Sequence, residues 1–434
     1  MRKGKRWLAA AVSAAMIVQS LASVGPVYAA DDGVSIADTF TDSSFRSYVS
    51  SNFDTDSNGY LSDAEISNVT SIDVSKCSPA ISSLNGVELF TNLSKLDCNE
   101  QSIRNLDIEN LENLEYIDVS SNRIDSLTLP VSAEKLTYLD ISGNKITSLT
   151  SLADYNNLVL LNANSTNLSS IDVSNMKGLK VLGVSGTTIS TLDLGSNMEL
   201  TTLYCDSMRS LPVLDVSGHE KLKNLYCAGA KSDSGVVVRS SITKLDVSGD
   251  IVLGSLDCSN SYVAELNIDN TPALTTLDCS NTRLTSIDVS KNTSLSYLDV
   301  SSNVLGAVDF TANTALRELY VKDTGINKLD VSTLTNLVNL DASSNSLAEL
   351  DIASNSLLEK LYISDNNIQG IKLDGHPDLK ELEIDNNNLV AIDISVCPKL
   401  YGDDGVFSCS GNSRDITLDT TNYDYDFSDF SKVY

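Results

Sequence analysis

Leucine recurs at a fixed interval of 21 residues in the C-terminal half of this chain, and this period constrains the fold more than any other feature. The series is Leu274, Leu295, Leu316, Leu337, Leu358, Leu379 and Leu400. Counting that leucine as position 1, apolar residues also occupy positions 4, 6, 11, 14 and 16 of each period. One period is too short to bury its own leucines, so the pattern predicts coils that stack and share one continuous core.

Position 9 of the period is the second diagnostic position. It is Asn in several periods, namely Asn303, Asn345, Asn366 and Asn387. Asn there can hydrogen-bond the backbone of the turn that follows a strand of about three to five residues, whose side chains at positions 4 and 6 face inward. In five other periods a hydroxyl stands in its place, at Thr166, Thr187, Ser261, Thr282 and Thr324. The second half of the period, as in LTSIDVS, is also typical of a short strand.

The pattern LxxLxLxxNxL resembles the leucine-rich repeat family, in its nested 21-residue subtype. The run ISSLNGVELFTNL at 81–93 resembles the entry into internalin-type repeat domains. The resemblance implies a mainly β solenoid, a right-handed superhelix with a parallel concave sheet, short convex strands and a small α-helical N-terminal cap. We count fourteen full periods from Leu93 to Leu379. One interval between successive leucines is longer than the others, because it contains an insertion at 228–241. The insertion is either a protruding binding loop or extra chain without a binding role, and we prefer the second interpretation.

The N-terminal segment resembles a secretory signal peptide. Four basic residues, an apolar middle and small residues before Ala30 predict cleavage after Ala29; an uncleaved membrane anchor is the alternative. We therefore expect a signal peptide at 1–29, a helical cap at 30–68, repeats at 69–400, and a C-terminal cap and tail at 401–434. The protein is expected to be secreted or exposed at the cell surface, and related surface proteins often continue into further modules.

The segment FDTDSNGYLSDAEI at 53–66 resembles an EF-hand calcium loop. Its predicted ligands are Asp54, Asp56, Asn58, the carbonyl of Tyr60, Ser62 and Glu65. Gly59 stands where the loop turns sharply, and the spacing predicts helices over 36–53 and 62–68. We interpret it as one structural Ca²⁺ site in the cap. The alternative is an acidic helix-capping loop without a metal.

The eight cysteines divide into two groups. Position 6 holds an inward-facing cysteine in five periods, at Cys98, Cys205, Cys227, Cys258 and Cys279. Side chains in register on parallel strands have poor disulfide geometry, so we interpret these as small buried hydrophobes. Cys397 and Cys409 both lie at the C-terminal end of the array, where a capping disulfide between them is predicted.

Two columns of polar residues mark the predicted surface. Outward positions 3 and 5 of the concave strands carry seven tyrosines, namely Tyr116, Tyr138, Tyr204, Tyr226, Tyr297, Tyr320 and Tyr362, and position 5 also carries Asp97, Asp118, Asp140, Asp257, Asp278, Asp299 and Asp341. Tyr is favoured at binding surfaces, although it also suits strands. Position 15 carries ten aspartates, which we expect to accept hydrogen bonds from the following turn rather than to bind calcium. They are Asp107, Asp172, Asp193, Asp215, Asp246, Asp288, Asp309, Asp330, Asp351 and Asp393.

Composition and motifs favour a binding protein over an enzyme. The formal net charge of −28 argues against nucleic acid and anionic membranes, and favours bound cations or a basic partner. The two histidines, His219 and His376, are several periods apart, and no catalytic motif is present. We predict a monomeric adhesion or recognition module for a protein or glycan ligand, and no catalysis. The alternative is a non-binding structural spacer within a larger surface assembly.

Overall fold

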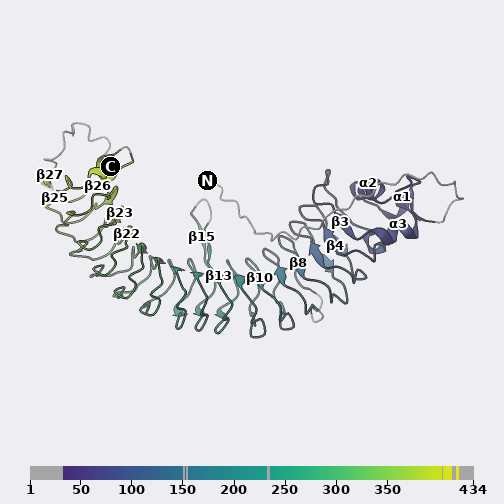
Figure 1. Ribbon diagram of the computed structural model, residues 1–434, viewed down its shortest axis with the longest axis horizontal. Helices are drawn as coiled ribbons and strands as arrows, with labels where there is room; N and C mark the ends of the chain where they lie inside the picture. Colours follow the sequence, from purple (N-terminus) through teal and green to yellow (C-terminus); the bar gives the residue numbers. More distant parts are fainter. Residues whose placement is uncertain are drawn as a thin grey trace.

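The chain forms a long arc of stacked coils, with one end capped by short helices (Figure 1). The computed structural model describes residues 33–149, 152, 155–231, 235–402, 404–412 and 417–419. The predicted signal peptide and most of the tail beyond 412 lie outside these residues. Among the helices described, none has the length and apolar character needed to cross a bilayer. The predicted mainly β solenoid is confirmed.

One parallel sheet of sixteen strands follows the inner side of the arc. In order along the sheet, its strands are β3 (Ser71–Asp73), β4 (Lys95–Asp97), β6 (Tyr116–Asp118), β8 (Tyr138–Asp140), β9 (Leu160–Asn162), β10 (Val181–Gly183), β11 (Thr202–Tyr204), β13 (Asn224–Tyr226), β17 (Ser255–Asp257), β19 (Thr276–Asp278), β20 (Tyr297–Asp299), β21 (Glu318–Tyr320), β22 (Asn339–Asp341), β23 (Lys360–Tyr362), β24 (Glu381–Glu383) and β26 (Val406–Ser408). Equivalent positions pair throughout, as Leu277 with Leu298. Thus β3 and β26 extend the fourteen predicted periods at the two ends.

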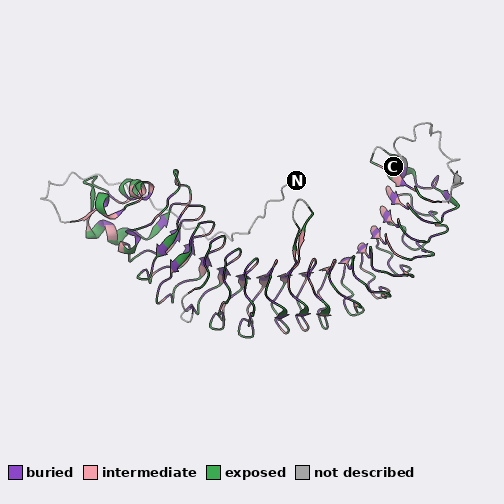
Figure 2. Cartoon of the chain, turned by 180° about the vertical axis from the view of Figure 1, so that it is seen from behind, coloured by how far each residue is buried: buried purple, intermediate pink, exposed green. Residues whose placement is uncertain are grey.

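The core runs along the whole arc as a single cluster of inward-facing side chains. Figure 2 shows buried residues recurring from coil to coil of the chain. Leu274 and Leu277, at positions 1 and 4, are fully buried. Burial of one such side chain contributes about 1.5–3 kcal/mol. Because each coil contacts only its neighbours, this contribution is repeated from coil to coil, as in other solenoids.

The predicted asparagine ladder is confirmed. Asn303 donates from Nδ2 to the carbonyls of Cys279 and Val300, both at 2.9 Å, and its Oδ1 accepts from the amide of Leu284 at 3.0 Å. The hydroxyl substitutes make a similar bond to the residue three positions back: Thr282 donates to the Cys279 carbonyl at 2.9 Å. These bonds satisfy backbone groups that the stacked coils remove from water.

Position 8 of the period is a feature that the sequence pattern did not reveal. Its residue has a positive φ in coil after coil, for example 54° at Ser302, 55° at Ser344 and 65° at Gly143. The left-handed conformation turns the chain sharply after the strand. Gly, Asn and Asp, which tolerate this conformation best, share these positions mainly with Ser.

On the convex side, the predicted second strands form only in part. The described residues contain three small parallel sheets there: β5 (Asn105–Asp107) with β7 (Ser126–Thr128); β12 (Val213–Asp215), β16 (Lys244–Asp246) and β18 (Glu265–Asn267); and β25 (Ala391–Asp393) with β27 (Thr417–Asp419). The position-15 aspartates have the expected structural role. In each of the ten, Oδ1 accepts the amide of the residue two positions later.

Three short helices and a two-stranded sheet form the N-terminal cap. They are β1 (Val34–Ser35), α1 (Ile36–Thr39), α2 (Ser43–Asn52), β2 (Tyr60–Leu61) and α3 (Asp63–Asn68). The prediction of one helix over 36–53 is wrong, because the Asp42 carboxylate caps the amides of Ser44 and Phe45 and starts a new helix. The rings of Phe40, Phe45 and Phe90 then join the cap to the first coil, with Phe40 stacked on Phe90 at 6.0 Å. A 3₁₀ turn, η1 (Val87–Leu89), precedes the first period, and η2 (Pro398–Tyr401) follows the last.

The described part of the insertion at 228–241 forms a β-hairpin, and not the irregular extra chain that we preferred from the sequence. Strands β14 (Ala230–Lys231) and β15 (Val237–Val238) pair antiparallel, and the hairpin rises on the concave side of the arc (Figure 1). Arg239 fixes its base: Nη1 donates to the Ser261 carbonyl at 2.9 Å, and the guanidinium lies 5.6 Å from the centre of the Tyr262 ring.

Candidate functional site

The cap holds the predicted calcium loop between α2 and α3 in a pre-organised form. Asp54 accepts the amide of Asn58 at 3.1 Å on Oδ1 and that of Gly59 at 3.0 Å on Oδ2. Glu65 accepts the amide of Thr55 at 2.6 Å on Oε1 and that of Ser62 at 2.9 Å on Oε2. Gly59 has a φ of 85°, which explains why glycine occupies this turn. Both ends of the loop are therefore fixed by its own carboxylates.

Three of the predicted ligands converge. Carboxylate oxygens of Asp54, Asp56 and Glu65 lie within 4.8 Å of one another, and Asp54 and Glu65 are at most 9% exposed. Burial raises the pKa of Glu65, but hydrogen bonds from Thr55 and Ser62 outweigh it and lower the pKa to about 2. Residues 54–65 contain no basic side chain. An all-oxygen donor set of this charge fits a hard divalent cation such as Ca²⁺.

The remaining three predicted ligands are in place but make other contacts. Asn58 Oδ1 accepts the amide of Tyr60 at 2.7 Å, and the Ser62 hydroxyl donates to Glu65 Oε2 at 2.9 Å. Tyr60 belongs to β2, which pairs antiparallel with β1, so its side chain is directed to solvent. Thr55, which the motif does not include, holds Glu65 through its amide and its hydroxyl. Strand β1 supports the loop by pairing with β2, at Val34 with Leu61 and Ser35 with Tyr60.

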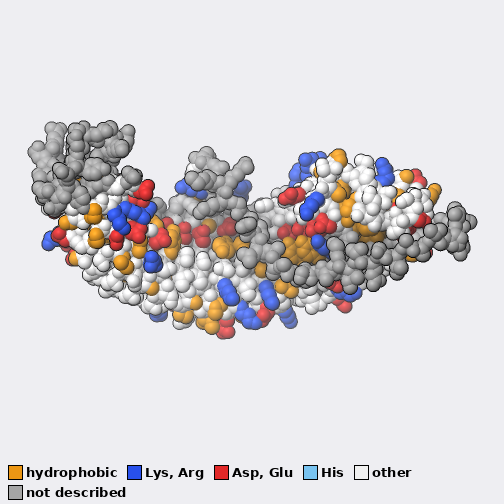
Figure 3. Space-filling model, turned by 45° about the horizontal axis from the view of Figure 1, so that its top comes forward, with side chains coloured by type: hydrophobic (Ala, Val, Ile, Leu, Met, Phe, Trp, Pro, Cys, Tyr) orange, Lys and Arg blue, Asp and Glu red, His pale blue; other side chains and the backbone are white. Residues whose placement is uncertain are grey.

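The concave sheet brings six of the seven predicted tyrosines together in pairs on neighbouring strands of the sheet. The ring centroids are 4.3 Å apart for Tyr116 with Tyr138, 5.0 Å for Tyr204 with Tyr226, and 5.5 Å for Tyr297 with Tyr320. The hydroxyl of the seventh, Tyr362, contacts Glu381. Acidic side chains accompany them along this face (Figure 3). Half-buried aromatic platforms beside carboxylates are chemically suited to recognition of a partner.

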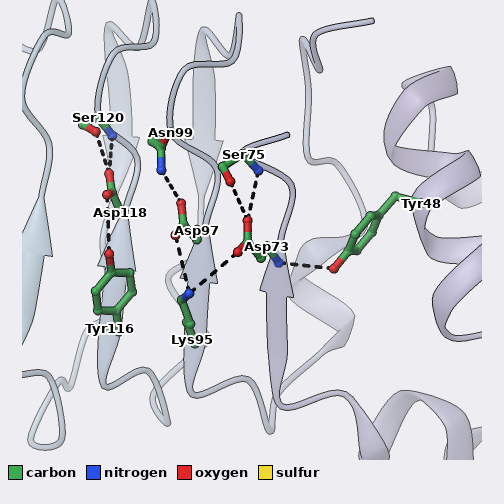
Figure 4. A network of polar contacts seen from close by, with 9 residues as sticks. All are labelled: Tyr48, Asp73, Ser75, Lys95, Asp97, Asn99, Tyr116, Asp118 and Ser120. Carbon is green, nitrogen blue, oxygen red and sulfur yellow. Dashed lines mark hydrogen bonds and ion pairs between the residues drawn. The ribbon is translucent and has the colours of Figure 1, made fainter. Parts of the chain in front are cut away.

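A polar network links the cap to the first strands of the concave face (Figure 4). The Asp73 amide donates to the Tyr48 hydroxyl of α2 at 3.2 Å. Lys95 Nζ lies 3.9 Å from Asp73 Oδ2 and 3.5 Å from Asp97 Oδ2, and 5.1 Å from the centre of the Tyr116 ring. Lys95 was not among the predicted site residues. Its partners lie on three successive strands of the sheet, so its role appears only when the pairing of these strands is known.

Asp278 on the concave face is costly to ionise, because it is largely buried and lies beside other carboxylates. Burial raises the pKa of Asp278 to about 6; hydrogen bonds from Ser280 oppose the rise, and the charges of Asp257 and Asp299 add to it. Because folding raises the pKa of Asp278, its protonated form stabilises the folded state. This contribution to the free energy of unfolding is fully present below the ordinary carboxyl pKa and is lost as the pH rises through about 6.

We therefore expect Asp278→Asn to raise the melting temperature at pH 8 by about 2 °C or more, and to have a smaller effect at pH 4. Thermal melts at the two pH values test this. Asp288→Asn is the control in the same period, because hydrogen bonds from Ser290 lower the pKa of Asp288. An Asp278→Asn effect that is equal at both pH values would contradict the prediction.

Family models and solved structures that match this chain have the same repeat architecture. Family models describing leucine-rich repeats match residues 112–154 and 291–309. The functional domain of InlJ from Listeria monocytogenes superposes with a TM-score of 0.72 and 31% sequence identity, over 85% of this chain and 79% of that domain. This chain belongs to the internalin-like leucine-rich repeat proteins. No curated protein sequence matches it.

Other solved structures share the fold of this internalin-like chain at lower identity. The internalin InlF from Listeria monocytogenes has a TM-score of 0.53 and 17% identity, over 90% of this chain and 98% of that one. A leucine-rich repeat protein of Leptospira interrogans has a TM-score of 0.54 and 20% identity, over 75% of this chain and 91% of that one. The fold is therefore common to proteins that have diverged widely in sequence.

The InlJ domain is described as including a cysteine ladder. In our internalin-like chain, four fully buried cysteines directly follow the adjacent strands β11, β13, β17 and β19, with Cys227 next to Cys205. All are free thiols, which agrees with their prediction as buried hydrophobes. Cys397 and Cys409 are also free thiols, so the structure does not contain the predicted disulfide.

Both histidines of this internalin-like chain are buried between coils. His219 places Nδ1 2.7 Å from the Val216 carbonyl and Nε2 3.2 Å from the Leu194 carbonyl, and His376 faces the carbonyls of Leu373 and Ile352 at 3.1 Å. Each imidazole thus links two successive coils. These contacts give the histidines a structural role in the core.

Proposed function

We propose that this internalin-like chain is a secreted or cell-surface recognition module that binds a partner protein along its concave face. The three tyrosine pairs carry this proposal. Rings held at fixed positions by the sheet present contact area at little entropic cost when a partner binds. The similarity of this chain to the functional domain of InlJ, at 31% identity, supports the proposal.

We further propose that one Ca²⁺ ion stabilises the cap. Asp54, Asp56 and Glu65 would supply carboxylate oxygens, with Asn58, the Tyr60 carbonyl and Ser62 as the remaining ligands. The ion would compensate the charge that Asp54 and Glu65 bury there. Since the cap is joined to β3 through Tyr48 and Asp73, a rigid cap holds the first strands of the concave face in place.

Alanine substitutions at Tyr204, Tyr226 and Tyr320 test the recognition proposal. With immobilised protein lacking residues 1–29 as bait for extracts of host and bacterial surfaces, we expect the triple variant to lose a partner that the unmodified chain retains. Loss of each central anchor should weaken binding by about 2 kcal/mol.

Phenylalanine at the same three positions is the matched control, because it keeps the ring and removes only the hydroxyl. A specific partner should remain bound to this variant. If every captured molecule is retained by the alanine variant, the concave face is not the binding surface, and the spacer interpretation is favoured. Loss of retention after glycosidase treatment of the extract would assign the ligand to a glycan.

A further inference from the structure

Near the cap, the concave face contains a lysine that lies between carboxylates on neighbouring strands. Lys95 on β4 lies between the carboxylates of Asp73 and Asp97 and close to the Tyr116 ring. The register of β3, β4 and β6 aligns Asp73, Asp97 and Asp118 in one row, with Tyr116 directly beside Lys95 in the next. Figure 4 shows this arrangement of three acids, one lysine and one aromatic ring. The lysine offsets charge in a row of carboxylates that would otherwise repel one another.

The same arrangement recurs on strands β17, β19 and β20, without the lysine. The register aligns Asp257, Asp278 and Asp299 in one row, and Ser255, Thr276 and Tyr297 in the next. With Ser71 on β3 at the position of Ser255, five of the six positions therefore hold the same residue as in the first arrangement. The exception is Thr276, which occupies the position of Lys95.

The carboxylates in the two rows are also bonded alike. In both rows, each Asp uses Oδ1 to accept a hydrogen bond from the turn after its strand, as Asp73 does from Ser75 and Asp278 does from Ser280 at 2.9 Å. In the first row, Oδ2 of Asp73 and Asp97 is the atom that faces Lys95. In the second row, Oδ2 of all three aspartates forms no hydrogen bond or ion pair with the residues that the structure describes.

We propose that Thr276 marks a cation position that a lysine or arginine side chain of a basic partner polypeptide fills. The proposal rests on the concave face being the binding surface. The incoming ammonium or guanidinium group would lie between the Oδ2 atoms of Asp257 and Asp278 and against the Tyr297 ring, as Lys95 does in the first row. Carboxylates and an aromatic face together favour such a group, and complementary charge sets orientation and partner choice.

An organic cation suits this position better than a metal ion. Calcium takes six to eight oxygens, whereas the site offers one outward oxygen each from Asp257 and Asp278 and the hydroxyl of Thr276. The Tyr297 ring, half-buried on the same face, occupies space that further oxygen ligands would need. A lysine or arginine can use both the carboxylates and the ring.

Binding of a fluorescein-labelled octalysine peptide to the chain lacking residues 1–29 tests the proposal, measured by fluorescence anisotropy at about 0.15 M salt, where the Debye length is about 8 Å. Thr276→Lys supplies the missing cation from within, so we expect about tenfold weaker binding. Thr285→Lys adds the same charge at an exposed position in the same period and should leave binding nearly unchanged. Octaglutamine is the control for the peptide.

Charge removal gives an independent test. Asp278→Asn should weaken octalysine binding about tenfold, while Asp288→Asn, an exposed change of equal charge in the same period, should not. Thermal melts of all four variants check that they fold, and Thr276→Lys is expected to melt no lower than the unmodified chain. If Thr276→Lys weakened octalysine binding no more than Thr285→Lys, and Asp278→Asn no more than Asp288→Asn, the peptide would respond only to the net charge of the chain. That result would overturn the proposal.

Two results would separate this inference from the recognition proposal. A partner lost on changing the tyrosines but retained by Thr276→Lys would refute the cation position and keep the concave face as the binding surface. Millimolar Ca²⁺ could also displace octalysine from the unmodified chain but not from the variant with Asp54→Ala and Glu65→Ala. This would show that octalysine binds at the cap, and would contradict the cation position at Thr276.

Discussion

Asn303→Ala is expected to lower the free energy of unfolding by about 3 kcal/mol, because it leaves several buried backbone groups without partners. The side-chain amide of Asn303 donates to the carbonyls of Cys279 and Val300, and its Oδ1 accepts from the backbone N–H of Leu284. Alanine removes all three bonds from a site that is 4% exposed. The midpoint of urea denaturation measures the loss.

Two further variants make this result interpretable. Asn303→Thr should cost less than alanine, because a threonine hydroxyl can still donate to the carbonyl three residues back, as Thr282 and Thr324 do in the neighbouring coils. Asn327→Ala changes an exposed asparagine and should cost less than 0.5 kcal/mol, as is usual at the surface (roughly ±0.5 kcal/mol). If Asn303→Ala and Asn327→Ala had the same denaturation midpoint, the ladder would contribute nothing to stability.

Much of the solenoid could be predicted because its period directly determines which side chains face inward. Positions 1, 4 and 6 need only be apolar to fill the core, and Asn or a hydroxyl at position 9 satisfies the turn, as Asn303 and Thr282 show. The position-8 turn was not predicted, since Ser302 and Gly143 share a backbone conformation and not a side-chain chemistry. The break after Phe40 was also missed, because the apolar spacing continues across it while the Asp42 cap interrupts the helix.

The candidate site was predictable where its residues are close in sequence. The loop from Asp54 to Glu65 follows a known spacing, so its converging carboxylates could be named in advance. Lys95 and Thr276 can be recognised as site residues only when the register of neighbouring strands is known, because their partners include residues one coil before and one coil after. The same holds for β1, a two-residue strand whose pairing with β2 leaves no recognisable pattern in the sequence.

Calcium is expected to raise the melting temperature of the cap, through preferential binding to the folded loop. At a free concentration one hundred times the dissociation constant, the gain is about 2.7 kcal/mol. Asp54→Ala combined with Glu65→Ala should abolish the shift. This double change also removes hydrogen bonds that hold the loop without metal, namely those to Gly59 and Ser62, so its melting temperature in chelator should fall as well.

Asp56→Asn separates metal binding from the folding of the loop, because Asp56 is exposed and contributes one of the three converging carboxylates. In chelator, we expect this variant to melt only slightly below the unmodified chain, because it can keep the bond from the Asn58 amide and loses only the exposed one from Asn58 Nδ2. Its shift with calcium should be much smaller. Asp63→Asn, an equal loss of charge at an exposed position outside the ligand set, should keep the full shift. Differential scanning calorimetry with calcium, magnesium or chelator would measure each case. Melting that is the same in calcium and in chelator for the unmodified chain would show that the loop caps α3 without a metal, which is the alternative that its sequence left open.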